Sequence, residues 1–269
     1  MIGPIGTPVF AMEQCKLCLQ YVDRLENSHY LPAGVYRILR DDREKNPHPW
    51  LLNGRTAVQV SWQMTAPLLC RECEQRLSKH GENWVLKHCL RKNGTFPLAS
   101  LLASKTPDLS SPENPTRIYY ASRIPEINIL ALAYFAASIF WRGSIHPWND
   151  DGSIPVELGP FQEQFRRYLM GLQAFPKDSS LWVMVREGKE IDRLTYAPVG
   201  ERKGNFHVYK FPMPGLAFLL TVSKNIPVNH REICFVHGVG NPIIVTSVID
   251  RLLVDDAVKM RQKSVRLPG

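Results

Sequence analysis

Two pairs of cysteines constrain this chain more than any other feature of its sequence. Cys15 and Cys18 form one CxxC pair, and Cys70 and Cys73 form a second. Two intervening residues let both thiolates of a pair bind one ion from a tight turn, and two pairs complete a tetrahedral site of four sulfurs. Thiolates are soft ligands that favour zinc over magnesium or calcium. The sequence therefore predicts a structural Zn²⁺ site.

Other uses of cysteine fit this chain less well. A secreted disulfide framework is disfavoured, because 269 residues carry only six cysteines and residues 1–11 show no signal-peptide pattern. A redox CxxC stays open for a single pair, but the presence of two pairs speaks against it. Cys89 and Cys234 lack sequence partners and are expected to be small buried apolar residues, with His88 as an alternative ligand source. Structural zinc contributes roughly 10–16 kcal/mol in small peptides, so we expect the surrounding region to need the ion.

Composition and charge restrict the class of protein. A hydrophobic content of 44% excludes wholesale disorder, and the 33 Lys and Arg against 25 Asp and Glu give a net charge of +8. That excess is spread along the chain, so it favours a polyanionic partner only weakly, and solubility explains it equally well. The most apolar stretch, 127–141, is shorter than the roughly 20 residues of a membrane span. We expect a buried helix there, no membrane association and a cytoplasmic location.

The order of patterns predicts an α+β protein in two parts. Residues 1–12 are expected to be a flexible tail, 13–95 a four-cysteine domain, 96–116 a Pro- and Ser-rich linker, and 117–269 an α+β domain. A strand over 58–69 precedes the second cysteine pair, and a helix follows it. In the last part the patterns predict helices over 127–142, 158–172 and 244–262, and antiparallel strands over 181–186, 206–211, 216–222 and 233–239.

His29 lies between the two cysteine pairs, in the pattern Ser28-His29-x-x-Pro32. A neutral imidazole has a pKa near 6.5 and can take a proton from water. Hydrolysis of a phosphodiester would also need a divalent cation to stabilise charge on the leaving oxygen. A purely structural role is equally open, in which the imidazole hydrogen-bonds the hairpin next to the zinc site.

These motifs together resemble a known family. The series CxxC, SHxxP and LLCxxCE, continued by Arg76-Leu77-Ser78 and Gly81-Glu82, is similar to the zinc-bearing branch of the HNH endonuclease superfamily and to a group of bacterial HNH-like proteins. The resemblance implies a treble-clef fold of the ββα-metal type with His29 as general base. It also implies a catalytic Mg²⁺ or Mn²⁺, cleavage of nucleic acid, most often DNA, and a setting in bacterial defence or mobile elements.

The chain departs from active members of this family at two positions. Ser28 stands where they carry a metal-binding Asp, Glu or His, and Glu74 stands where they carry Asn or His. Carboxylates at Glu74 and Glu82 can still bind a hard cation, so both join His29 as candidate catalytic residues. The plainer alternatives are that Glu74 complements the helix dipole and that Glu82 is a solvated carboxylate.

Three further features of the sequence are not assigned to the catalytic set. Asn53 is a candidate for the Asn that braces the HNH loop. Arg142 interrupts the apolar helix, and a buried pairing is favoured over a phosphate contact. The polar turn that holds His146, Asn149, Asp150 and Asp151 is expected to be an ordinary surface loop.

The leading hypothesis is a zinc-binding, nucleic-acid-interacting protein with metal-dependent HNH-type endonuclease chemistry. The first alternative is a catalytically inactive zinc module that recognises nucleic acid or a partner protein. The second is a structural subunit or a homo-oligomer.

Overall fold

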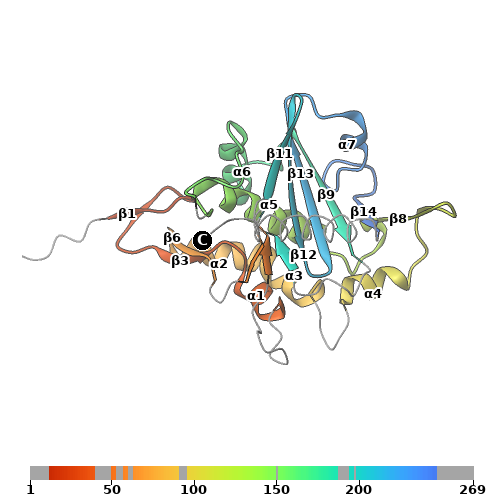
Figure 1. Ribbon diagram of the computed structural model, residues 1–269, viewed down its shortest axis with the longest axis horizontal. Coiled ribbons are helices and arrows are strands. Elements are labelled where there is room, and N and C mark those ends of the chain that lie inside the picture. Colours follow the sequence, from red (N-terminus) through yellow and green to blue (C-terminus); the bar gives the residue numbers. More distant parts are fainter. Residues whose placement is uncertain are drawn as a thin grey trace, which may run out of the picture.

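The computed structural model describes residues 12–39, 50–52, 57–59, 63–90, 96–149, 151–186, 194–196 and 198–246. They form a mixed α/β molecule. A long helix, α5 (Ile129–Ile145), lies between a large sheet and the helices that follow the second cysteine pair (Figure 1). The chain therefore places the helices that follow the second cysteine pair and the large sheet on opposite sides of one helix.

The first ninety residues supply short elements around the cysteines. In chain order they are β1 (Glu13–Gln14), β2 (Tyr21–Val22), β3 (Glu26–His29), α1 (Ala33–Leu39), β4 (Trp50–Leu52), β5 (Ala57–Gln59), β6 (Thr65–Leu69), α2 (Arg71–Leu77), the π-helix η1 (Ser78–Glu82) and α3 (Asn83–His88). β1 pairs with β2, and β3 pairs with β6, each time antiparallel. α2, η1 and α3 follow one another without a break, and we call residues 71–88 the cysteine helix.

The remainder of the chain builds the sheet and its covering helices. Its elements are α4 (Pro97–Ala103), β7 (Leu109–Ser111), β8 (Asn114–Tyr120), the 3-10 helix η2 (Ala121–Arg123), α5, α6 (Phe161–Leu169), β9 (Ser179–Val185), β10 (Leu194–Tyr196), β11 (Val199–Lys203), β12 (Phe206–Met213), β13 (Leu216–Val222), α7 (Val228–Glu232) and β14 (Pro242–Val245). The helices predicted over 127–142 and 158–172 are thus confirmed as α5 and α6, with bounds shifted by a few residues.

The large sheet has seven strands in the order β11-β12-β13-β9-β14-β8-β7. The antiparallel strands predicted over 181–186, 206–211 and 216–222 are confirmed as β9, β12 and β13. In the described sheet β14 and β9 run parallel, which was not predicted. The strand predicted over 233–239 is wrong, because that segment turns back on itself. The Gly238 amide donates to the Cys234 carbonyl at 2.7 Å, and Gly240 has a φ of 73°. Because of these turns, the next strand begins only at Pro242, as β14.

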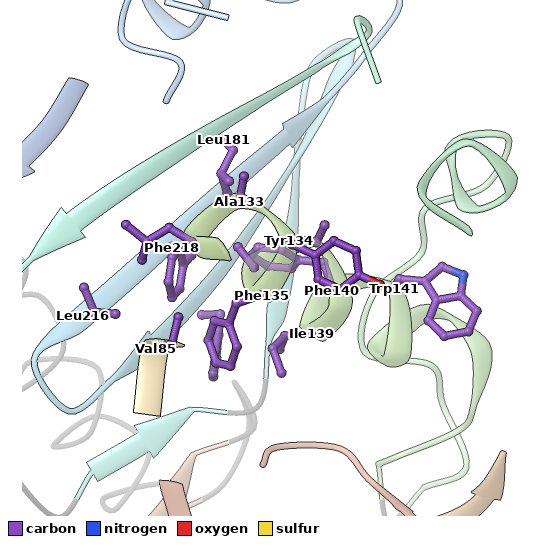
Figure 2. Packing of buried hydrophobic residues seen from close by; sticks show 14 of the residues in the cluster. Val85, Ala133, Tyr134, Phe135, Ile139, Phe140, Trp141, Leu181, Leu216 and Phe218 are labelled. Carbon is purple, nitrogen blue, oxygen red and sulfur yellow. The ribbon is translucent and has the colours of Figure 1, made fainter. Parts of the chain in front are cut away.

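Helix α5 is buried on nearly all sides, as its apolar composition predicts. The ring of Phe135 packs against Phe218 on the sheet, with ring centroids 5.8 Å apart, and Figure 2 shows Val85 of α3 on the other side of the same cluster. Helix α5 is therefore the centre of the core.

No helix within the described segments is both long and apolar enough to cross a membrane.

Two expectations about domain organisation need correction. The segment 96–116, expected to be a linker, contains α4 and the edge strand β7. Pro97 occupies the first turn of α4, where its missing N–H costs nothing, and Leu98 and Leu102 are buried. The other correction concerns the two expected parts, which share one continuous hydrophobic core and also pair β4 with β10. Of the helix predicted over 244–262, residues 244 and 245 belong to β14, and residues 247–269 lie outside the described residues.

Candidate metal centre and the adjoining pocket

The four predicted ligands come together. The sulfur atoms of Cys15, Cys18, Cys70 and Cys73 all lie within 4.8 Å of one another, and none of the four is in a disulfide. Zn–S bonds of about 2.3 Å arranged as a tetrahedron place sulfurs about 3.8 Å apart. The Sγ atoms of Cys18 and Cys70 are 3.8 Å apart. The donor set and its spacing therefore fit a tetrahedral metal such as zinc.

The first pair is held by a turn between β1 and β2. The Cys15 amide donates to the Gln20 carbonyl and the Leu19 amide to the Cys15 carbonyl, both at 2.9 Å. Leu19 adopts a φ of 64°, in the left-handed region that favours glycine. These hydrogen bonds keep a non-glycine residue there, and the turn points both sulfurs to the same side.

The second pair lies at the start of the cysteine helix. Cys70 is the N-cap of α2, Cys73 lies in its first turn, and the Cys70 amide donates to the Cys15 sulfur at 3.3 Å. A helix N-terminus offers free N–H groups and a positive end of the dipole, which stabilise thiolates. The helix end therefore favours the thiolate forms that a bound ion needs, in opposition to burial and to the neighbouring sulfurs.

The close packing of the four cysteine thiols limits how many of them can be ionised at the same time. A hydrogen bond from the Cys73 thiol lowers the pKa of Cys15 to about 4, against the opposing effect of burial. The hydrogen bond to Cys15 also raises the pKa of Cys73 well above its usual range, and burial raises that of Cys70 to about 12. Only a cation lets all four sulfurs be thiolates together, so metal binding would release protons.

The other potential zinc ligands lie elsewhere. Cys89 and Cys234 are both buried, as expected for small apolar residues. His88, the alternative ligand source, stacks on Trp84 with ring centroids 4.9 Å apart. Among the described residues, the four cysteines form the one group of three or more potential ligands drawn close enough for a metal.

The three candidate catalytic residues line one pocket. It has a volume of about 360 Å³, and we call it the His29 pocket. Its described lining consists of His29, Pro32, Ala33, Gly34, Arg37, Glu74, Gln75, Ser78, Glu82, Leu86 and Arg142. His29 ends β3, whereas the two glutamates come from the cysteine helix. The fold thus unites residues that are separated by more than 40 positions in the sequence.

Arg142 of α5 contacts both glutamates of this pocket. Its Nη2 lies 2.7 Å from Glu82 Oε1 and 3.8 Å from Glu74 Oε2, and its side chain is 2% exposed. The favoured interpretation of Arg142 as a buried pairing is therefore confirmed. One buried oxygen of Glu74, Oε1, accepts no hydrogen bond from the described residues. It is therefore a candidate ligand for a cation in this pocket.

The π-helix explains how two residues eight positions apart reach one guanidinium. In a regular α-helix they would lie roughly 80° apart around the axis. A π turn is wider, so each of its residues rotates the chain less and the offset shrinks. Gly81 permits this segment to lie close to α5, since a Cβ there would be 2.9 Å from Phe135 Cα. The sequence indicated a disturbed helix at Gly81, but not its geometry.

Several sequence-based expectations lie outside this arrangement. Ser28 is fully buried and is not among the pocket residues, so it offers no ligand there. Asn53 and Asp150 lie outside the described residues. The sequence did not indicate that Arg37, Gln75 and Ser78 also line this pocket. Their helical spacing from the named residues was the signal that could have placed them there. Comparison of the chain with protein-family models, curated protein sequences and solved structures gives no match.

Proposed function

We propose that the chain is a zinc-stabilised, nucleic-acid-interacting protein that hydrolyses phosphodiester bonds in the His29 pocket. One observation carries this proposal: His29, Glu74 and Glu82, selected from sequence as an HNH-like set, line one pocket beside the cysteine cluster. The resemblance of the SHxxP and CxxCE motifs to HNH endonucleases supplies the reaction type. The net charge of +8 suits a polyanionic substrate.

The order of elements supports the treble-clef part of the proposal. A cysteine turn, an antiparallel strand pair and a helix carrying the second cysteine pair follow one another as β1–β2, β3–β6 and α2. In such a unit the metal fixes the helix against the strands. Zinc would therefore hold the glutamates of the cysteine helix at a set distance from His29.

The residues of the pocket have separate roles in the proposed reaction. His29 would accept the proton of the attacking water as general base. Glu74 Oε1, to which no described residue donates a hydrogen bond, is a suitable hard ligand, so Glu74 and Glu82 are the residues that would help to hold Mg²⁺ or Mn²⁺, an ion that would stabilise charge on phosphate oxygens. Arg142 holds Glu82 in place and orients Glu74.

A second candidate function is a binding module without hydrolysis. Two observations favour it: Glu82 is already paired with Arg142, and Ser28 is buried where active relatives carry a metal ligand. Such a module would keep zinc and nucleic-acid binding but would not cleave.

Cleavage of supercoiled plasmid and of labelled single strands separates the two functions. The wild type is compared with His29→Ala in Mg²⁺, in Mn²⁺ and in EDTA. A matched control is His80→Ala, an exposed histidine of the cysteine helix that is not among the His29-pocket residues. Cleavage that His29→Ala abolishes and His80→Ala retains supports hydrolysis. Absence of wild-type cleavage in both metals, with binding retained, leaves the binding module.

A further inference from the structure

The cysteine helix is divided into rows of residues four positions apart. One row, consisting of Cys73, Leu77, Gly81, Val85 and Cys89, is buried along its whole length. A regular α-helix has 3.6 residues per turn, so such a row would wind around it. The wider π turn of η1 compensates for that winding. Each row therefore keeps to one side of the helix.

The row on the opposite side points to solvent. Its members are Arg71, Gln75, Lys79, Asn83 and Lys87, and all five are exposed. They lie two positions from the buried row, which is roughly 200° around the axis. We call this set the outward row. It consists only of cations and amides, all of which donate hydrogen bonds, and it contains no carboxylate.

Within the described part of the chain, the acid that interacts electrostatically with the outward row is Glu72, through the adjacent Arg71. No salt bridge of the described residues involves Arg71, Lys79 or Lys87. Glu74 and Glu82 face the His29 pocket and are paired with Arg142. The single positive charge of Arg142 therefore offsets one of these two negative charges. Glu72 is the remaining exposed carboxylate of this helix.

The outward row borders the proposed reaction site. Gln75 lines the His29 pocket, and it also lines a second pocket of about 380 Å³ on the cysteine side. Lys79 and Arg76 line that second pocket as well. A chain lying along the row would thus pass beside the pocket that contains His29.

We propose that the outward row is the docking surface for the sugar–phosphate backbone of a nucleic acid. The inference rests on the partner class in the proposed function, but not on hydrolysis. Successive cations are eight residues apart, so Arg71 and Lys87 span roughly 24 Å. At about 3.4 Å per nucleotide this is a footprint of about seven nucleotides. Gln75 and Asn83 donate to sugar and phosphate oxygens between the charged contacts.

The test compares two triple variants that remove the same charge. The row variant is Arg71→Gln, Lys79→Gln and Lys87→Gln. The control variant is Lys177→Gln, Lys210→Gln and Lys224→Gln, three exposed cations of the other part of the chain. Zinc content and circular dichroism establish that both are folded. Fluorescence anisotropy then gives the Kd for 12-nucleotide duplex DNA, single-stranded DNA and single-stranded RNA over a range of salt concentrations.

We expect the row variant to bind at least tenfold more weakly at low salt. Its slope of log Kd against log salt should fall by about 3 for the duplex or about 2 for a single strand, because three phosphate contacts are lost. The nucleic acid whose slope changes identifies the preferred form. Equal weakening by both triple variants would overturn the inference and leave nucleic-acid binding standing. Absence of wild-type binding to all three probes would overturn the inference and the proposed function together. Row-dependent binding without cleavage would refute hydrolysis alone.

Discussion

The guanidinium of Arg142 lies 2.7 Å from the carboxylate of Glu82 and joins the central helix α5 to the cysteine helix. Both side chains are largely buried, at 2% and 13% exposed. This ion pair ties the position of the His29 pocket to the core of the whole molecule. It also leaves Arg142 Nε and Nη1 buried without hydrogen-bond partners, so the arrangement is sensitive to the loss of either member.

Replacing Arg142 by Met should destabilise the protein by about 3–5 kcal/mol, because Glu82 would keep a buried charge without its partner. Urea unfolding measures the change. Glu82→Gln in the same background should restore part of the loss, since the uncompensated carboxylate is then absent. A double-mutant coupling energy close to zero would show that the pair is not energetically linked.

Gly81→Ala should destabilise the protein, although alanine ordinarily stabilises a helix by roughly 0.5–1 kcal/mol relative to glycine. A Cβ at Gly81 would be 2.9 Å from the Cα and N atoms of Phe135, and backbone atoms of a buried helix cannot move aside cheaply. Overpacking of this kind costs about 1–3 kcal/mol. The matched control is Ser78→Ala in the same π segment, where the side chain is half-buried. Thermal unfolding should therefore give a Tm that falls clearly more in Gly81→Ala than in Ser78→Ala.

Cys18→Ser should abolish stoichiometric zinc binding, because an alcohol does not replace a thiolate in a tetrahedral zinc site. The wild type is expected to hold one zinc ion per chain, measured by elemental analysis of the purified protein. Cys234→Ser is the control, since Cys234 is equally a free cysteine but lies outside the cluster. Equal zinc content in the two variants would contradict the assignment of the ligands.

Removal of zinc from the intact protein should lower its thermal stability. Without the ion the four sulfurs must be partly protonated, and their mutual packing is then unfavourable. Incubation with a chelator at neutral pH, followed by calorimetry, is expected to give a lower Tm that added Zn²⁺ restores. Because one hydrophobic core joins both parts of the chain, we expect the whole molecule to unfold at the lower temperature, and not the first ninety residues alone. An unchanged Tm after complete removal would refute a structural role for the ion.

Acidification should weaken the fold through His230. Burial, with a smaller effect of Lys203, lowers the pKa of His230 below its ordinary value of 6.5. The unfolded state therefore binds a proton first as the pH falls, so this contribution is complete above pH 6.5 and declines below it. His230→Gln should show a smaller stability difference between pH 7.5 and pH 5.5 than the wild type, by urea unfolding. The pKa values of His88 and His146 are also lowered, but these residues are present in both the wild type and His230→Gln, so their contributions cancel in the comparison. A difference equal to that of the wild type would show that His230 does not titrate in this way.

The sequence by itself determined the features that depend on local spacing. Two residues between cysteines suffice to orient a pair of ligands, so the sequence identified all four cysteines of the cluster that could hold a metal ion. The apolar runs of α5 and β13 likewise predicted a helix and a strand, because the length and apolar composition of a run can be read from neighbouring residues. The convergence of His29, Glu74 and Glu82 on one pocket agrees with a set chosen from sequence, while their roles stay a prediction.

Only the tertiary structure decided how distant segments meet. Nothing near Glu82 in the sequence indicates that its partner is Arg142, because that contact depends on the packing of α5 against the cysteine helix. The parallel pairing of β14 with β9 and the entry of β7 into the sheet are decided in the same way, by which strand edges remain available once the core has formed. The close approach of Phe135 to Gly81 belongs to this group too, since it depends on the packing of α5 against η1.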